Sequence, residues 1–150
     1  MKNLLEGEGG IEEKIGEYQF GFRKKKGVEE CSLALKALDE IEYRKGNALA
    51  SCFLDIKKAY DTIPHDVVAA SLKRLDVHPR LTRFLHNWCR GHERKLLIPN
   101  NSENSWLKVS RGVPQGSAIA PLLFSCVMDT LREHMNGEPV LGNTLSLIHI

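Results

Sequence analysis

The sequence predicts a single α+β domain, and three observations support this. Several stretches have apolar residues at helical spacing, residues 48–54 form an apolar run of strand length, and two short strand-like segments flank a polar turn. With 150 residues, of which 42% are hydrophobic and 27% charged, the chain has the composition of a globular protein with one core. We therefore expect helices and strands that share one core.

The N-terminal half is expected to run from a tail into a helix and then a strand. Residues 1–17 are rich in Glu and Gly and are interpreted as a linker or tail, apart from one helical turn at 11–16. Apolar residues then recur at helical spacing from Val28 until Gly46, which is typical of a helix end. The apolar run 48–54 follows, and we expect it to be a buried strand that leads into Asp55.

The C-terminal half is expected to contain two helices, a hairpin and a long helix. Asp66 is interpreted as the N-cap of a helix to about Leu75, and a second helix starts at Pro79 and stops before Gly91. Segments 94–98 and 106–110 predict a hairpin, and a long helix is expected from near Pro121 to 136–137. The side chains expected to face inward in the helix pair are Val67, Val68, Leu72, Leu75, Leu81, Phe84, Leu85 and Trp88.

Charge and cysteine content restrict the class of protein. The formal net charge is only +2, but residues 23–26 form a contiguous basic cluster. Such a cluster suits a phosphate backbone and is equally typical of a solvated loop. The four cysteines form no C-x-x-C pair, and three of them lie in apolar stretches, which predicts buried thiols in a reducing, intracellular compartment, nuclear or cytoplasmic. No apolar run has transmembrane length, so no membrane association is expected.

Two patterns that resemble sites have simpler interpretations. His86, Cys89 and His92 have plausible metal-ligand spacing, but a zinc site needs four ligands and no second pair accompanies them. His65 beside Asp66 is interpreted as the start of a helix, because no nucleophile elbow supports a Ser/His/Asp site.

Three segments carry residue types that suit a nucleotide-handling site. In FLDIKKAYD, residues 53–61, lysines and an aromatic follow an acid at the end of the apolar run, which suits metal ions and phosphates. In RGVPQGS, residues 111–117, two glycines and a proline allow the backbone to approach a flat or charged ligand. In QFGFR, residues 19–23, aromatics precede the basic cluster, where they could stack on bases.

Taken in this order, the three segments resemble motifs of the reverse transcriptases, most closely those of non-LTR retrotransposons. Residues 53–61 are similar to the palm motif that carries the first catalytic aspartate. Residues 111–117, with PLLF at 121–124, are similar to the following nucleotide-binding motif, and residues 19–23 to a preceding fingers motif. The resemblance implies a partial polymerase palm over residues 18–138, with an antiparallel sheet packed on helices and part of a fingers subdomain.

The activity implied by the resemblance is RNA-templated DNA synthesis by a two-metal-ion mechanism. It implies an RNA template, a DNA primer, dNTPs and Mg²⁺ or Mn²⁺, and it leaves the oligomeric state open. Asp55 is implied as the catalytic metal ligand, with the backbone carbonyl of Ile56 as a second metal contact. Tyr60 is implied as the aromatic gate that excludes a ribose 2′-hydroxyl by steric clash. Residues implied to contact the nucleotide or the template are Gln115, Gly112 and Gly116 for the nucleotide, and Arg23, Lys24, Lys25 and Lys26 for the template.

Other acids receive no catalytic role. Asp61 is expected to be a structural hydrogen-bond acceptor, and Asp129 in the long helix is interpreted as a surface residue. The family's palm also uses a Tyr/Phe-x-Asp-Asp motif, and this sequence contains no Asp-Asp pair. We therefore expect the 150-residue chain alone to lack polymerase activity, because one of three carboxylates cannot assemble a two-ion site.

Two other functions stay open, and the last residues are treated separately. The chain could be a non-catalytic RNA-binding remnant of a retrotransposon, or a metal-dependent hydrolase built on Asp55 and Asp61. Residues 139–150 are expected to be a tail. Its end, LSLIHI at 145–150, is what CTG-TCT-CTT-ATA-CAC-ATC encodes, which resembles a transposase adapter from sequencing libraries, so these six residues are expected to be an artefact.

Overall fold

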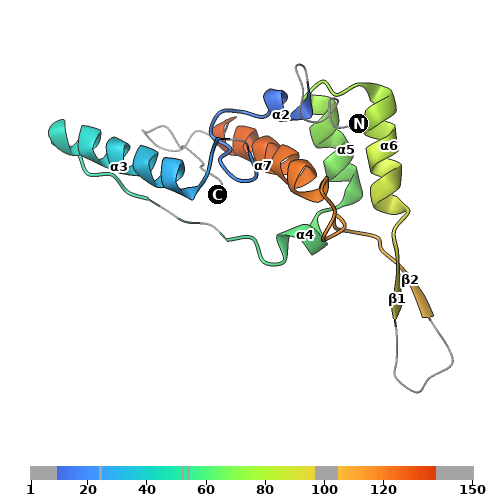
Figure 1. Ribbon diagram of the computed structural model, residues 1–150. Coiled ribbons are helices and arrows are strands. Elements are labelled where there is room, and N and C mark those ends of the chain that lie inside the picture. The colour runs from blue at the N-terminus through green and yellow to red at the C-terminus, as the bar shows by residue number, and fades with distance from the viewer. Residues whose placement is uncertain (1–9, 24, 52, 54, 97–104, 138–150) are drawn as a thin grey trace. The chain divides into compact units, whose positions relative to one another are not determined.

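A computed structural model describes residues 10–23, 25–51, 53, 55–96 and 105–137 (Figure 1). Helices dominate these residues, and the one sheet in them is a two-stranded hairpin. The chain divides into two compact units: the first comprises residues 1–57 and 128–150, and the second residues 58–127. No helix in the described ranges combines the length and apolar character needed to span a bilayer. The expected tail at 139–150 lies outside the described residues.

In the first unit, the packed part of the chain begins before Tyr18. Helix α2, Ile11–Lys14, is the expected helical turn, and both Ile11 and Ile15 are buried. Their spacing of four residues places them on the same side of the turn, which a linker would not require. Residues 10–17 therefore contribute to the core, although the sequence suggested a tail from 1 to 17.

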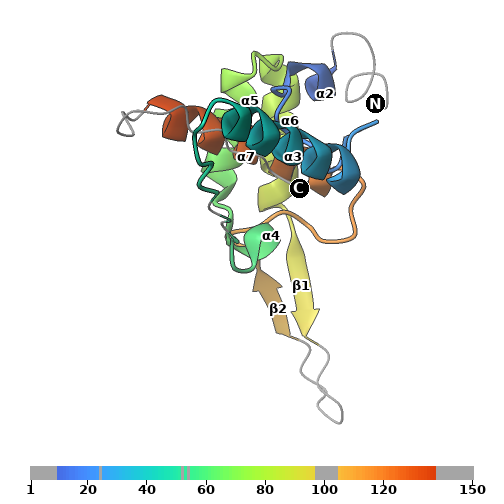
Figure 2. The same ribbon diagram turned by 90° about the vertical axis from the view of Figure 1, so that its left-hand side faces the viewer.

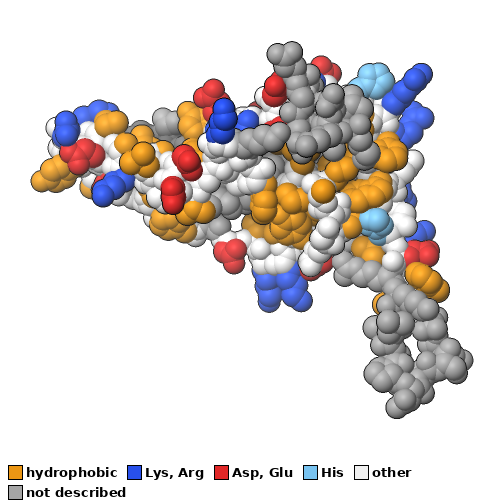
Figure 3. Space-filling view, viewed as in Figure 1, with side chains coloured by type: hydrophobic (Ala, Val, Ile, Leu, Met, Phe, Trp, Pro, Cys, Tyr) orange, Lys and Arg blue, Asp and Glu red, His pale blue; other side chains and the backbone are white. Residues whose placement is uncertain are grey.

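Helix α3, Val28–Arg44, confirms the helix predicted from apolar spacing. Arg44 and Glu40, four residues apart, form an exposed ion pair of 2.9 Å, which supports the last turn. Of the apolar side chains of α3, Cys31 is buried, whereas Leu33 is 70% exposed. Figure 3 accordingly shows hydrophobic side chains on the surface of this helix.

The apolar run at 48–54 is not a strand at the positions that the structure describes. Residues 47–51 and 53 have no regular secondary structure, and Phe53 is 80% exposed, while residues 52 and 54 lie outside the described set. A strand depends on backbone hydrogen bonds to a neighbouring strand. Among the described residues only β1 and β2 pair in this way, so the prediction of a buried strand here is wrong. Composition favoured a strand but could not supply its partner.

The second unit is built on a helix pair, which follows the short helix α4, Ala59–Thr62. Helices α5, His65–Arg74, and α6, Pro79–Arg90, lie side by side (Figure 1). Gly91 caps the end of α6, as the sequence predicted. The buried side chains of the pair include Val68, Leu72, Leu85 and Cys89.

Three details of the helix pair differ from the prediction. Helix α5 begins at His65 with Pro64 as its N-cap, so Asp66 lies in the first turn and does not cap the helix. Val67 and Phe84 are 39% and 50% exposed, although both were expected to face inward. Helical spacing identifies the apolar face only to within about one residue on each side, because an apolar stripe is about 100° wide.

The hairpin and the long helix confirm their predictions. Strands β1, Glu93–Leu96, and β2, Ser105–Lys108, pair antiparallel, with Glu93 opposite Lys108 (Figure 2). Helix α7, Ala120–Gly137, crosses the boundary between residues 127 and 128 that separates the two units. Cys31, Cys89 and Cys126 are buried, as expected for three of the four cysteines.

Candidate nucleotide-binding site

The loop 111–117 packs directly against the backbone of residues 60–63. Gly112 N donates to Ile63 O at 2.7 Å, and Val113 N donates to Tyr60 O at 2.8 Å. Gly112 has φ +91°, and a Cβ atom placed there would lie 2.7 Å from Tyr60 O. Glycine is needed on both counts, because it alone adopts positive φ readily and leaves room for the backbone. The close packing of this glycine is thus against another part of the chain, and its predicted contact with a nucleotide stays a prediction.

Two further contacts fix the junction between the loop 111–117 and residues 60–65. The backbones of Pro64 and Arg111 form an isolated antiparallel bridge. The ring Nε2 of buried His65 lies 3.0 Å from Gly112 O. Because a carbonyl oxygen only accepts, His65 Nε2 carries the hydrogen and donates it. His65 therefore stabilises the loop, in agreement with its interpretation as a structural residue.

Gln115 is held by Asp61, the acid that we expected to be a structural hydrogen-bond acceptor. Gln115 Nε2 donates to Asp61 Oδ2 at 3.0 Å, which confirms Asp61 as a hydrogen-bond acceptor. Gln115 is itself exposed. Its amide has a second N–H and a carbonyl oxygen, so the contact with Asp61 orients the group and leaves polar atoms for a ligand.

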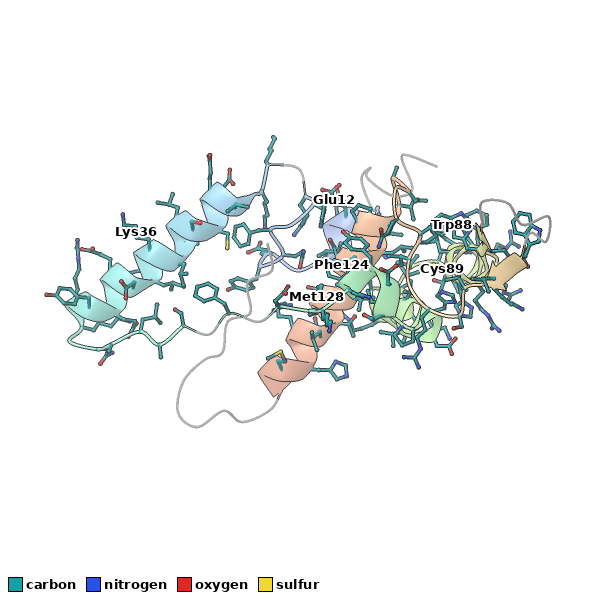
Figure 4. All side chains as sticks on the ribbon, turned by 90° about the horizontal axis from the view of Figure 1, so that it is seen from below. Glu12, Lys36, Trp88, Cys89, Phe124 and Met128 are labelled. Atoms are coloured by element: carbon teal, nitrogen blue, oxygen red, sulfur yellow. The ribbon has the colours of Figure 1, made fainter. Side chains whose placement is uncertain are left out.

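Tyr60 stacks on helix α7. Its ring lies 4.9 Å from that of Phe124, with an angle of 23° between the planes (Phe124 is labelled in Figure 4). Burial raises the pKa of the Tyr60 hydroxyl, so the phenol stays protonated at neutral pH. Gly116 has φ +82° with open space around it, so its backbone conformation favours glycine but no neighbour demands it.

A hollow of about 390 Å³ lies beside the junction, within the second unit. It brings together two of the predicted nucleotide contacts, Gly112 and Gln115, and it also contains Asp61. The other two predicted contacts, Tyr60 and Gly116, are not part of its lining. The remaining lining residues are His92, Glu93, Val109, Val113 and Pro114.

The predicted metal ligands do not form a complete donor set. Asp55 and Ile56 lie in the first unit, in an exposed segment without regular structure. Among the residues that the structure describes, no three His, Cys, Asp or Glu side chains come together in a way that could hold a metal ion. One exposed carboxylate and one backbone carbonyl are fewer protein ligands than a two-ion site requires. We therefore derive no catalytic step through Mg²⁺ or Mn²⁺ from the described residues.

The basic cluster at 23–26 does not present four equivalent cations. Arg23 donates to three backbone carbonyls, those of Gly16 at 2.7 Å, Glu12 at 3.2 Å and Gln19 at 3.5 Å. These bonds make Arg23 a support for the segment that precedes it.

The lysines of the cluster differ from one another. Lys26 Nζ donates to Glu17 O and lies 5.3 Å from the centre of the Phe20 ring. Burial, and then the charge of Arg23, lower the pKa of Lys26. Lys25 is exposed, whereas Lys24 lies outside the described residues. In the described part of the cluster, Lys25 is therefore the cation most accessible to a phosphate group.

Asp129 is buried, so its interpretation as a surface residue is wrong. It is 2% exposed, and its Oδ1 accepts a hydrogen bond from Gly16 N at 3.0 Å. Arg132 Nη2 lies 3.5 Å from the same oxygen. One signal could have revealed this: Asp129 follows buried Cys126 by three residues, which places it on the apolar face of α7.

Comparison with known proteins agrees with the motifs. The family model described as reverse transcriptase (RNA-dependent DNA polymerase) matches residues 1–148. The chain is 35% identical over 117 residues to an RNA-directed DNA polymerase from mobile element jockey of Drosophila funebris, a match covering 74% of this chain and 12% of that protein. The jockey polymerase of Drosophila melanogaster is 32% identical over 126 residues, covering 80% and 13%.

A second type of retrotransposon is also similar. The Pol polyprotein from retrotransposable element R2 of Nasonia vitripennis is 29% identical over 109 residues, covering 73% of this chain and 10% of that protein. The chain thus spans about a tenth of the length of these relatives. On the family match over nearly its whole length, the chain belongs to the reverse transcriptase (RNA-dependent DNA polymerase) family.

Proposed function

We propose that this chain is part of an enzyme that synthesises DNA on an RNA template. The observation that carries the proposal is the family match over residues 1–148, with jockey polymerases among the relatives. The substrates of the proposed reaction are an RNA template, a DNA primer and dNTPs. Mg²⁺ or Mn²⁺, held by the complete protein, would stabilise the attacking and leaving oxygens of the phosphoryl transfer. The finer architecture that we propose is a palm whose antiparallel sheet packs on helices, with residues 18–138 forming part of it and of the fingers.

Within that enzyme, we assign the metal contacts to Asp55 and to the backbone carbonyl of Ile56. Support comes from their place in FLDIKKAYD and from the exposure of Asp55, which leaves its carboxylate open to an ion. Carboxylate and carbonyl oxygens are the ligands that Mg²⁺ prefers.

We assign nucleotide recognition to the second unit. Gln115 would contact the incoming nucleotide or the template base with the amide atoms that Asp61 does not engage. Tyr60 would exclude a 2′-hydroxyl by clash, and its stacking on Phe124 would hold the ring in place. Gly112 would act indirectly, since its hydrogen bond to Ile63 O positions the loop, and Gly116 gives the loop its positive-φ turn.

Primer extension tests the proposal. A long read across the source locus would identify the longer reading frame, and we expect the protein made from it to extend a DNA primer on RNA when Mg²⁺ is present. Asp55→Asn in that protein should abolish extension. Asp39→Asn makes the same chemical change at an exposed acid of α3 and should leave extension unchanged. We expect the 150-residue chain alone to be inactive; incorporation by it, or full activity of D55N, would contradict the assignment.

A non-catalytic RNA-binding remnant is the second candidate. It is favoured by the exposure of Lys25 in the basic cluster, which leaves a cation open to a phosphate group. Two results together would support it: the chain binds RNA with an affinity that falls as salt rises but does not depend on Mg²⁺, and the reading frame at the source locus decays. A hydrolase built on Asp55 and Asp61 has less support, because Asp61 is engaged by Gln115.

A further inference from the structure

We propose that a second hollow, lined by both residues of the Pro64–Arg111 bridge, binds the phosphodiester backbone of single-stranded RNA. The hollow has a volume of about 350 Å³ and lies entirely within the second unit. Arg90, Lys108 and Arg111 line it, together with Ser110 and Asp66. The sequence analysis assigned no ligand contact to any of the three cations, Arg90, Lys108 and Arg111.

The three cations come from separate parts of the chain. Arg90 is the last residue of α6, Lys108 is the last residue of β2, and Arg111 precedes Gly112 in the loop. All three side chains are exposed. The hydrogen bonds and ion pairs among the described residues engage none of these three side chains. Three cations that no described residue engages, around one concave surface, favour a ligand with several negative charges.

The backbone around the hollow is held firmly. The Pro64–Arg111 bridge fixes one rim, and the hydrogen bond of 3.1 Å from Val109 N to His92 O fixes another. The cations are therefore presented by anchored segments, which limits the conformational entropy lost when a ligand binds.

The start of helix α5 adds to the positive potential. Pro64, the N-cap of α5, and His65 both line the hollow, and no side chain caps the helix there. The N-terminus of a helix of ten residues carries a partial positive charge that attracts phosphate. Asp66 opposes this effect, but its Oδ1 lies 2.9 Å from His86 Nε2, and one acid among three cations leaves the hollow positive.

An exposed aromatic side chain favours RNA over a simple anion. Trp106 is 63% exposed and lies two residues before Lys108 on β2, so the two side chains point to the same face of the hairpin. An exposed aromatic ring on the same face as one of the cations suits a strand whose bases can stack while its phosphates pair. The identification of the ligand as RNA rests on the proposed function, but binding itself requires neither catalysis nor a metal ion.

Salt-dependent binding of a fluorescein-labelled single-stranded RNA to the 150-residue chain tests the inference, without Mg²⁺ or dNTPs. The variant R90Q/K108Q/R111Q should reduce the slope of log K against log salt by roughly 2, because each lost phosphate contact contributes about 0.7 for a single strand. By the same coefficient, affinity in about 0.1 M salt should fall on the order of 100-fold.

The matched control is K73Q/R80Q/R83Q. It removes one lysine and two arginines that are exposed on α5 and α6, so the net charge changes equally, and we expect slope and affinity to stay close to those of the unmodified chain. Equal losses in both triple variants would show a general charge effect and overturn the inference, as would no loss in the first variant. If the first triple variant fails to fold, R90Q and K108Q are measured singly, each with an expected slope change of about 0.7.

Two further measurements separate this inference from others. R90K/R111K keeps the charges and should retain the salt slope, which a purely structural role of the guanidinium groups would not allow. Competition by inorganic phosphate as effective as competition by unlabelled RNA would indicate an ordinary anion site and contradict backbone binding. Failure of primer extension by the longer protein would refute the proposed function but leave this binding result intact.

Discussion

Replacing Gly112 by alanine should destabilise the second unit far more than the same change at Gly116. Both glycines have positive φ, +91° and +82°, so alanine at either position costs about 1–2 kcal/mol for the backbone conformation alone. At Gly112 the new Cβ would also lie 2.7 Å from Tyr60 O and 2.9 Å from Asp61 Cα, both backbone atoms that cannot rotate away.

The extra cost at Gly112 can be worked from the contacts that must open. Moving the two segments apart breaks the hydrogen bonds from Gly112 N to Ile63 O and from Val113 N to Tyr60 O, each worth roughly 1 kcal/mol. G112A should therefore lose about 3–4 kcal/mol in total, against a whole-domain stability of about 5–15 kcal/mol. At Gly116 no atom lies within 4 Å of the added Cβ, so only the conformational cost applies.

Urea denaturation followed by tryptophan fluorescence measures this difference. Both tryptophans of the chain, Trp88 and Trp106, lie in the second unit, so the signal reports on that unit. We expect the free energy of unfolding to fall about 2 kcal/mol further in G112A than in G116A. Equal losses in the two variants would refute the close packing of the loop against residues 60–61.

Two more outcomes follow from buried groups. Asp129→Ala leaves the Gly16 N–H without its acceptor, so the free energy of unfolding should fall by about 1–3 kcal/mol. Asp129→Asn keeps an acceptor oxygen and should lose less. Equal losses of the two variants in thermal or urea melts would argue against the hydrogen bond. Burial raises the pKa of the Cys89 thiol from 9.0 to about 11, so at pH 8 the thiol should react with a thiol reagent much more slowly in the native chain than in urea. The stability conferred by the protonated thiol is present below pH 9 and is lost as pH rises towards 11. Equally fast reaction in the native and urea-unfolded states would contradict the burial of Cys89.

The sequence predicted the elements whose signals are local. Apolar spacing and stop signals such as Gly91 predict helices α3, α6 and α7. The polar turn between two strand-like segments predicts the hairpin. The run at 48–54 has the composition of a strand, but a strand also needs a partner, and pairing is a non-local property that composition does not encode.

The candidate site was predictable in its residues and only partly in its contacts. The sequence predicted that Gly112 allows a ligand to approach closely, which stays a prediction; the structure adds that backbone atoms of Tyr60 and Asp61 lie close to this glycine. Asp129 was missed because an acid on a helix is usually exposed, and its partner, Gly16, lies 113 residues away in the sequence. Arg23 was assigned to a template by its basic neighbours, whereas its backbone acceptors depend on how the preceding turns fold.

The junction at Gly112 also bears on the order in which the second unit folds. His65 and Gly112 are 47 residues apart, and the segment between them contains α5, α6 and the hairpin. Closing so long a loop costs conformational entropy before the contacts of the junction can form. The contacts of the helix pair are more local, so we expect the helix pair to form first and the junction last. Contacts made after the transition state act mainly on the unfolding rate. Evolution could therefore tune how long this unit stays folded by changing the junction, while the speed at which it folds is left to the helices.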